Sequence, residues 1–316
     1  MLKTYWSRFF QARTRPNEDH VNRTESRFQR TAQAIADRPL SKALSSLPGT
    51  AESAKDDPEA PVFVLSASWR SGSTLLQRLL CSSERILIWG EPYAESMVVQ
   101  RLADSLSRFT ADWPSDGRYI GKKHSGKLHD RWIANLYPLP EDFKAAHRAF
   151  FDRLFAEPAR RYGYADWGLK EVRFGGREID YLRWLYPRGR FLLLVRDPGT
   201  AWRSYKGNNK TWYERWPERP VSSVTRFARM WQRIADDFVQ RADTEGTMLV
   251  RYEELGSDAT LVENLECFIG ARLDPEVLTQ RIRGVRRAPQ PLSDTEQKTI
   301  RDICGKTAGK LGYELS

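Results

Sequence analysis

Short apolar runs alternate with longer stretches of helical periodicity from about residue 60 onwards. Five runs rich in β-branched, aromatic and leucine residues predict strands near 62–66, 85–89, 167–171, 190–195 and 247–252. The run at 190–195 is almost entirely apolar, as expected for a parallel strand that is buried on both faces. Strands that alternate with helices predict an α/β fold, with a central parallel sheet of about five strands flanked by helices.

The two ends of the chain differ from this alternating pattern. Residues 1–58 are polar and mixed in charge, with one possible helix at 20–46 and a linker composition between Pro48 and Pro58. We therefore expect an N-terminal extension, helix plus linker, over 1–58, and a single catalytic domain over 59–316. Near the C-terminus, Ser293 to Glu296 predicts a capped helix start that runs on towards Gly305.

Composition narrows the possible functions. The chain has 51 Lys and Arg against 41 Asp and Glu, a net charge of +10, which indicates an anionic ligand, acceptor or surface. No segment resembles a nucleic-acid-binding motif, so a nucleic-acid partner is not expected. Cys81, Cys267 and Cys304 lack metal-ligand spacing, so no metal is expected.

No apolar stretch reaches the length of a membrane span, and the N-terminus lacks a secretory apolar region, so we expect a cytoplasmic protein without a transmembrane segment. The opening aromatic segment, Tyr5 to Phe10, fits peripheral contact with a membrane or partner, or a docked N-terminal helix. The sequence leaves the oligomeric state open.

The segment that follows the first strand carries candidate chemistry. Apolar residues up to Leu65 give way to small polar residues around Gly72, and a helical pattern begins near Leu75. Such a loop presents unpaired backbone N–H groups at a helix N-terminus, where the hydroxyls of Ser71, Ser73 and Thr74 would add donors for a phosphate-like anion. The alternative interpretation is a plain strand-to-helix turn that Thr74 caps.

The loop is P-loop-like but departs from the Walker pattern. When Gly72 is aligned with the second Walker glycine, Ala67 replaces the first glycine and Ser73 replaces the lysine. The cation here is Arg70, which comes before the glycine. Because the Walker lysine contacts the β and γ phosphates, its absence weakens the alternative function of a nucleotide-dependent phosphotransferase with a degenerate P-loop.

Polar residues follow the other predicted strands as well. Since ligands bind beyond the carboxyl ends of parallel strands, these residues are expected to meet the loop at one site. They are Glu91 after the second strand, Lys170 near the end of the third, Arg196 and Ser204 after the fourth, and the Arg251–Leu255 segment after the fifth.

Taken in this order, four segments resemble the sulfotransferases that use 3′-phosphoadenosine 5′-phosphosulfate: 70–76, 90–92, 195–198 with Ser204, and 251–255 leading to 268–270. The resemblance spans about residues 61–313. It implies a 5′-phosphosulfate loop formed by Arg70, Ser71, Gly72, Ser73, Thr74 and Leu75. It also implies that Arg196 and Ser204 clamp the 3′-phosphate, and that no metal is needed.

The loop arginine and the Gly90-Glu91 pair resemble the branch that includes tyrosylprotein sulfotransferases and bacterial carbohydrate and lipid sulfotransferases. This implies Glu91 as the catalytic base, with Arg70 and Lys170 stabilising the leaving phosphate. The alternatives are a structural Glu91–Arg70 pair and a Lys170 that extends to solvent. His124, in a basic loop at 121–127, is the rival base.

The acceptor is less clearly indicated. The segment 206–217 combines aromatic, amide and cationic side chains, which suits a sugar but equally suits a buried flap. Trp113, Trp132 and Tyr137 are similarly ambiguous. The sequence thus predicts sulfuryl transfer from 3′-phosphoadenosine 5′-phosphosulfate to a hydroxyl acceptor, a carbohydrate or glycolipid, by a single in-line displacement with Glu91 as the base.

Overall fold

A computed structural model describes residues 40–47, 59–110, 112–121, 127–130, 133–207, 221–280 and 290–315. The chain divides into two units, Met1–Pro39 and Leu40–Ser316. The first unit and the predicted linker at 48–58 lie outside the described residues. The account below concerns the second unit.

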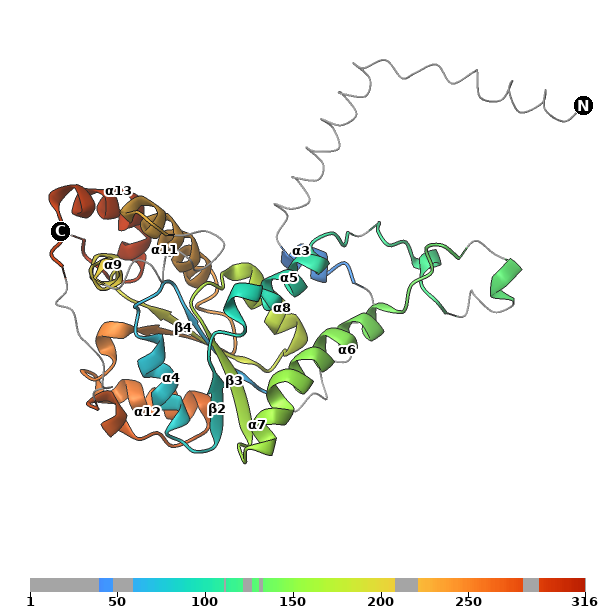
Figure 1. The fold of residues 1–316 in the computed structure, drawn as a ribbon, viewed down its shortest axis with the longest axis horizontal. Coiled ribbons are helices and arrows are strands. Elements are labelled where there is room, and N and C mark those ends of the chain that lie inside the picture. The colour runs from blue at the N-terminus through green and yellow to red at the C-terminus, as the bar shows by residue number, and fades with distance from the viewer. Residues whose placement is uncertain are drawn as a thin grey trace, which may run out of the picture. The chain divides into compact units, whose positions relative to one another are not determined.

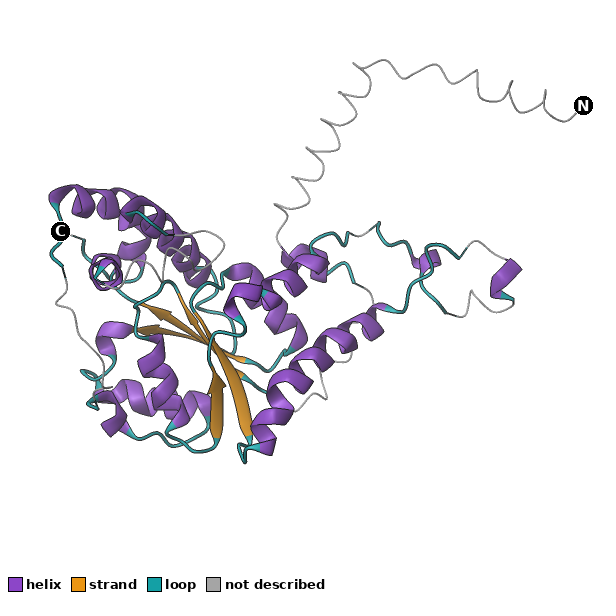
Figure 2. Cartoon of the chain, in the orientation of Figure 1, coloured by secondary structure: helices purple, strands orange, loops and turns teal. Residues whose placement is uncertain are grey.

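Five parallel strands form the centre of this unit (Figure 2). They are β1 (Val62–Ser66), β2 (Ile86–Trp89), β3 (Asp166–Glu171), β4 (Arg190–Val195) and β5 (Thr247–Arg251). Their order in the sheet is β2-β3-β1-β4-β5, and every neighbouring pair is parallel. The predicted fold class is confirmed, and each predicted strand boundary is met to within one residue.

Strand β1 lies at the middle of the sheet and is buried along its whole length. Phe63 is in register with Leu169 of β3 on one side and with Phe191 of β4 on the other. The chain builds β2 and β3 on one side of β1, and then β4 and β5 on the other. The loop after β1 therefore lies where the strand order reverses, which is the usual ligand-binding position in such sheets.

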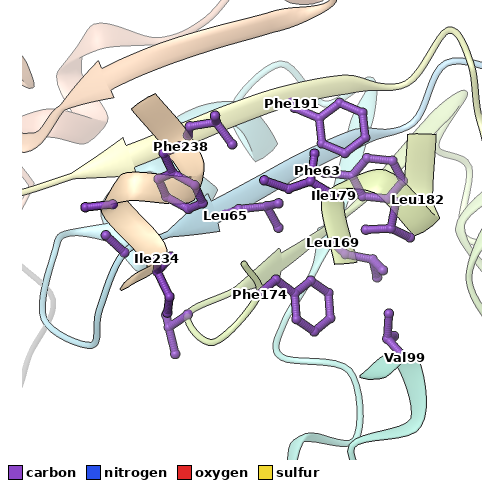
Figure 3. Close-up of a cluster of buried hydrophobic side chains, with 14 of the residues drawn as sticks. Phe63, Leu65, Val99, Leu169, Phe174, Ile179, Leu182, Phe191, Ile234 and Phe238 are labelled. Atoms are coloured by element: carbon purple, nitrogen blue, oxygen red, sulfur yellow. The ribbon is translucent and has the colours of Figure 1, made fainter. Parts of the chain in front are cut away.

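Helices cover both faces of the sheet (Figure 1). Because side chains alternate along a strand, Phe63 and Leu65 point to one face and Val62 and Val64 to the other. The first face packs against helices that include α5, α8 and α11, where Val99, Ile179 and Ile234 meet the sheet (Figure 3). The second face packs against α4 and α12.

The helices have the following bounds: α3 (Leu40–Leu44), α4 (Ser73–Cys81), α5 (Val98–Leu106), α6 (Pro140–Phe151), α7 (Glu157–Arg161), α8 (Gly176–Leu185), α9 (Pro198–Lys206), α11 (Val224–Val239), α12 (Ala259–Ile269) and α13 (Asp294–Lys310). A π-helical segment, Asp152–Ala156, joins α6 to α7. Among the described helices, none is long and apolar enough to cross a membrane.

The predicted C-terminal helix begins as expected but extends further. Ser293 and Glu296 form a reciprocal capping box, with N···O distances of 2.9 and 3.3 Å. The helix continues beyond Gly305 to Lys310, because buried residues such as Cys304 and Ala308 hold it against α11. Tertiary packing outweighs the weak helix propensity of glycine here.

Short helix α3 packs against α5 and α8, and Leu40, Ala43 and Leu44 are buried there. Residues 40–47 therefore contribute to the core, although the sequence pattern placed them in the extension.

Candidate active site

The loop between β1 and α4 has an unusual backbone. Arg70 and Gly72 both have left-handed conformations, with φ of 66° and 92°. Within the described part of the chain, the backbone N–H groups of residues 70–74 donate no hydrogen bond. Consecutive unpaired N–H donors at a helix N-terminus are typical of a loop that binds an anion.

Gly72 occupies the N-cap position of α4, and no side chain caps this helix end. The alternative prediction that Thr74 serves as the cap is therefore wrong. A Cβ atom at position 72 would lie 2.1 Å from Cδ2 of Tyr252, so the tyrosine ring packs directly on the loop. The same ring lies under the guanidinium of Arg196, with 4.0 Å from Cζ to the ring centroid.

The hydroxyl of Ser71 does not face the open side of the loop, contrary to expectation. Ser71 is fully buried, and its Oγ donates to the carbonyl of Ser68 and lies within hydrogen-bond distance of Ser66 Oγ. This hydroxyl braces the loop from inside and leaves the backbone N–H as the donor that Ser71 can offer. Ser73 is buried, whereas Thr74 is exposed and Leu75 is half-buried.

Arg70, Arg196 and Ser204 come together although the sequence separates them widely. Nη1 of Arg196 donates to the carbonyl of Arg70 at 2.7 Å, and Nε of Arg70 donates to Ser204 Oγ at 3.1 Å. The indole of Trp231 donates to the carbonyl of Arg196 at 3.0 Å. Burial lowers the pKa of Arg196, but a guanidinium remains protonated at neutral pH.

Asp197 does not pair with Arg196. Its carboxylate accepts from the backbone N–H of Thr200 at 2.7 Å and caps the start of α9. This carboxylate therefore serves as a helix cap, although its charge still acts on the nearby Arg196 guanidinium.

The ends of β2 and β3 bring Glu91 and Lys170 together. Nζ of Lys170 lies 2.6 Å from Oε1 of Glu91, and the two side chains are only 8% and 21% exposed. Both alternatives for these residues are wrong, since Lys170 does not extend to solvent and Glu91 does not pair with Arg70. The second carboxylate oxygen, Oε2, lies 3.9 Å from Nη2 of Arg173.

Arg173 is held in place by a buried carboxylate. Glu171, which is 1% exposed, accepts two hydrogen bonds from the Arg173 guanidinium at 2.8 and 2.7 Å. Burial raises the pKa of Glu171, and the bonds from Arg173 oppose this shift. These two hydrogen bonds hold the Arg173 guanidinium beside Glu91.

Several predicted residues do not join this cluster. His124, Trp132, the segment 208–217 and the basic stretch 281–287 lie outside the described residues. Trp113 packs on Phe109, with 5.8 Å between ring centroids, and Tyr137 pairs with the backbone of Tyr119. No described contact connects Trp113 or Tyr137 to Arg70 or Glu91.

Sequence reasoning expected the segment of Tyr252 at this site but gave the tyrosine no role, and it assigned no role to Trp231 or Arg173. Tyr252 follows β5 directly and Arg173 lies just past β3, so both are at the carboxyl edge of the sheet, where a role could have been inferred. Trp231 lies within α11, away from the strand ends, so no such signal marks it in the sequence.

Among the described residues, no group of three or more His, Cys, Asp or Glu side chains is arranged to hold a metal ion.

Comparison with known proteins adds an independent finding. A family model described as the sulfotransferase family matches residues 61–275. No curated protein matches the chain. The solved structures that match include the sulfotransferase domain from the curacin biosynthetic pathway, with 17% identity, 82% of this chain and 99% of that chain covered, and a TM-score of 0.46.

Two further matches are similar in extent. A sulfotransferase from Alicyclobacillus acidocaldarius shows 15% identity over 81% of this chain and 95% of that chain, with a TM-score of 0.45. The sulfotransferase domain of an olefin synthase from Synechococcus PCC 7002 shows 18% identity over 83% and 98%, with a TM-score of 0.43.

Proposed function

The chain belongs to the sulfotransferase family, and we propose that it transfers a sulfuryl group from 3′-phosphoadenosine 5′-phosphosulfate to a hydroxyl of a carbohydrate or glycolipid. The observation that carries this proposal is the loop at 70–74, whose unpaired backbone N–H groups adjoin a cluster of Arg70, Arg196 and Ser204. The donor has two anionic ends, a 5′-phosphosulfate and a 3′-phosphate, and this region offers donors for both.

The N–H groups of residues 70–74 would hold the 5′-phosphosulfate, because they lie at the N-terminus of α4, where the helix dipole favours an anion. Arg196 and Ser204 would hold the 3′-phosphate. The Ser204 oxygen accepts a hydrogen bond from Arg70, and a serine hydroxyl can donate as well as accept, so Ser204 could also contact a phosphate oxygen.

Glu91 is the proposed base. As the acceptor oxygen forms its bond to sulfur, the acceptor proton passes to Glu91, and the bond from sulfur to the bridging phosphate oxygen breaks. Negative charge then collects on that oxygen, which Lys170 and Arg70 stabilise by donating hydrogen bonds. The short Lys170–Glu91 contact orients Oε1 and leaves Oε2 to take the proton.

Nucleotide binding tests the donor assignment. Calorimetry should show that adenosine 3′,5′-bisphosphate binds the wild-type chain and that Arg196→Ala weakens binding by about 10- to 100-fold, since a charge-assisted phosphate contact is lost. Arg153→Ala is the matched control, because Arg153 is exposed and, among the described residues, forms its ion pair with Glu157 on a neighbouring turn. Binding of ATP with Mg²⁺ but not of the bisphosphate would instead support a phosphotransferase.

Turnover tests the base. With ³⁵S-labelled donor and a panel of saccharides and glycolipids, Glu91→Gln should reduce transfer by about 10²- to 10⁴-fold, the usual contribution of a general base. Bisphosphate affinity should stay within about twofold, because Glu91 is not assigned to the nucleotide. Glu157→Gln is the control for loss of a half-buried carboxylate that lies in an ion pair. Full activity of Glu91→Gln would reject Glu91, and His124 would become the candidate.

A further inference from the structure

A cavity of about 870 Å³ lies beside the proposed catalytic residues. Residues of α5, α8 and α11 line it, together with Trp69, which directly precedes Arg70. Arg173 also lines the cavity, and its Nη2 is 3.9 Å from Oε2 of Glu91. Through Trp69 and Arg173 the cavity adjoins both the anion loop and the proposed base, between which an acceptor hydroxyl must lie.

The lining of this cavity is strongly cationic. It includes five arginines and only two carboxylates: Arg173, Arg177, Arg226, Arg229 and Arg233 against Asp104 and Glu178. A site for a neutral acceptor would need no such excess of charge, because hydroxyl groups are recognised by neutral donors and acceptors as well as by charged ones.

The existing ion pairs do not neutralise this excess. Arg177 pairs with Asp104, and Arg173 is held by Glu171. Glu178 accepts a hydrogen bond from the backbone N–H of Gly175 at 2.9 Å and interacts with Arg177 and Arg233 only through longer-range electrostatics. Among the described residues, no carboxylate lies within ion-pair distance of Arg229 or Arg233, and both side chains are exposed.

The arrangement of the arginines on α11 also indicates an anionic ligand. Arg226, Arg229 and Arg233 are spaced by three and four residues, so they follow one face of the helix. Arg226 lies in the first turn, which contains no acidic residue, although a helix N-terminus favours negative charge. Arg229 and Arg233 are like charges four residues apart, so they repel one another, and an anion bound between α8 and α11 would offset that repulsion.

We propose that this cavity binds an acidic group of the acceptor, so that the substrate is an anionic saccharide that carries a carboxylate or sulfate near the hydroxyl to be sulfated. This inference rests on the proposed function for the identity of the reaction, but the acidic subsite itself is tested by binding alone. Arg229 and Arg233 are the specificity residues: a guanidinium group matches the two oxygens of a carboxylate, or two of the three terminal oxygens of a sulfate. Apolar residues in the lining, such as Met97 and Met230, would contact the sugar ring.

The test compares a hexuronic-acid disaccharide with its neutral methyl ester, which has nearly the same shape. Calorimetry with the full chain and adenosine 3′,5′-bisphosphate should show roughly tenfold tighter binding of the acid than of the ester, weakening as salt is raised. The double variant Arg229→Gln/Arg233→Gln should reduce this preference to within about twofold, while the ester binds unchanged. Arg301→Gln, an exposed arginine on α13, is the control and should keep the preference.

Three outcomes would overturn the inference. Equal binding of acid and ester would do so, and so would an acid preference that the double variant retains. Binding to vesicles of phosphatidylglycerol and phosphatidylcholine, without binding to the disaccharide, would reject a saccharide and assign the cavity to an anionic lipid. Failure of the bisphosphate to bind in the same samples would reject the proposed donor instead, so the two proposals fail separately.

Discussion

Replacing Gly72 with alanine tests the packing that shapes the anion loop. Gly72 has a φ of 92°, and a left-handed conformation costs an L-residue about 1–2 kcal/mol. The added methyl would also lie 2.1 Å from Cδ2 and 2.5 Å from Cε2 of Tyr252, whereas carbon atoms in contact are roughly 3.5–4.0 Å apart. The ring must therefore move by more than an ångström, and it must leave its position under Arg196.

The expected cost is the sum of these two effects. Displacing the ring loses a cation–π contact of about 0.5–2 kcal/mol, since the Arg196 Cζ lies 4.0 Å from the ring centroid. With the backbone strain, Gly72→Ala should destabilise the chain by about 1.5–4 kcal/mol. In a Tyr252→Ala background the methyl meets no ring, so the cost should fall to the strain alone, about 1–2 kcal/mol.

Urea denaturation of the four proteins in this double-mutant cycle measures the coupling directly. Gly270→Ala is the matched control, because Gly270 is also left-handed, with φ of 69°, but a Cβ there would meet nothing within 4 Å. Its cost should be the same in both backgrounds. If Gly72→Ala also costs the same in both, within about 0.3–0.5 kcal/mol, the ring does not press on the loop and the reasoning fails.

Three further predictions concern buried groups. Burial lowers the pKa of His147, so its contribution to stability is present above its unfolded pKa of about 6.5 and is lost as the pH falls. In urea titrations between pH of about 7.5 and 5, the His147→Gln variant should therefore lose less stability than the wild type, and equal losses would contradict this. Burial raises the pKa of Cys304 to about 12, so a chromogenic disulfide reagent should label the exposed Cys267 rapidly and Cys304 only after unfolding. Rapid labelling of Cys304 in the folded chain would refute its burial. A Cβ at Gly168 would lie 1.9 Å from a carbonyl oxygen of β1, so Gly168→Ala should cost about 3 kcal/mol or more in chemical denaturation, and a cost below about 1 kcal/mol would argue against this register.

The sheet could be predicted from sequence because its signals are local. A strand buried on both faces, such as β4, reads as a continuous apolar run, and it needs no knowledge of its neighbours. The same holds for the helix start at Ser293, where the capping residues are three positions apart. The prediction was least accurate where packing decides, as at the end of α13, which passes Gly305 because its buried face rests on α11.

The site could be predicted only in part. Strand order places Glu91, Lys170 and Arg196 at one edge of the sheet, but sequence does not give the contacts between them. The Lys170–Glu91 pair joins residues 79 positions apart, and the Arg70–Ser204 bond joins residues 134 apart. The direction of the Ser71 hydroxyl was also not predictable, because it follows from the left-handed turn at Arg70.

Helix α11 connects the two halves of the proposed reaction. Trp231, on its buried side, donates to the carbonyl of Arg196 and so fixes the residue proposed to hold the 3′-phosphate. Arg229 and Arg233, on its exposed side, line the cavity proposed for the acceptor. Because one rigid helix positions both, the distance between nucleotide and acceptor is set by the packing of α11 on the sheet and not by a loop. Since in-line transfer depends on that distance, a change that shifts α11 should impair turnover more than it impairs the binding of either substrate.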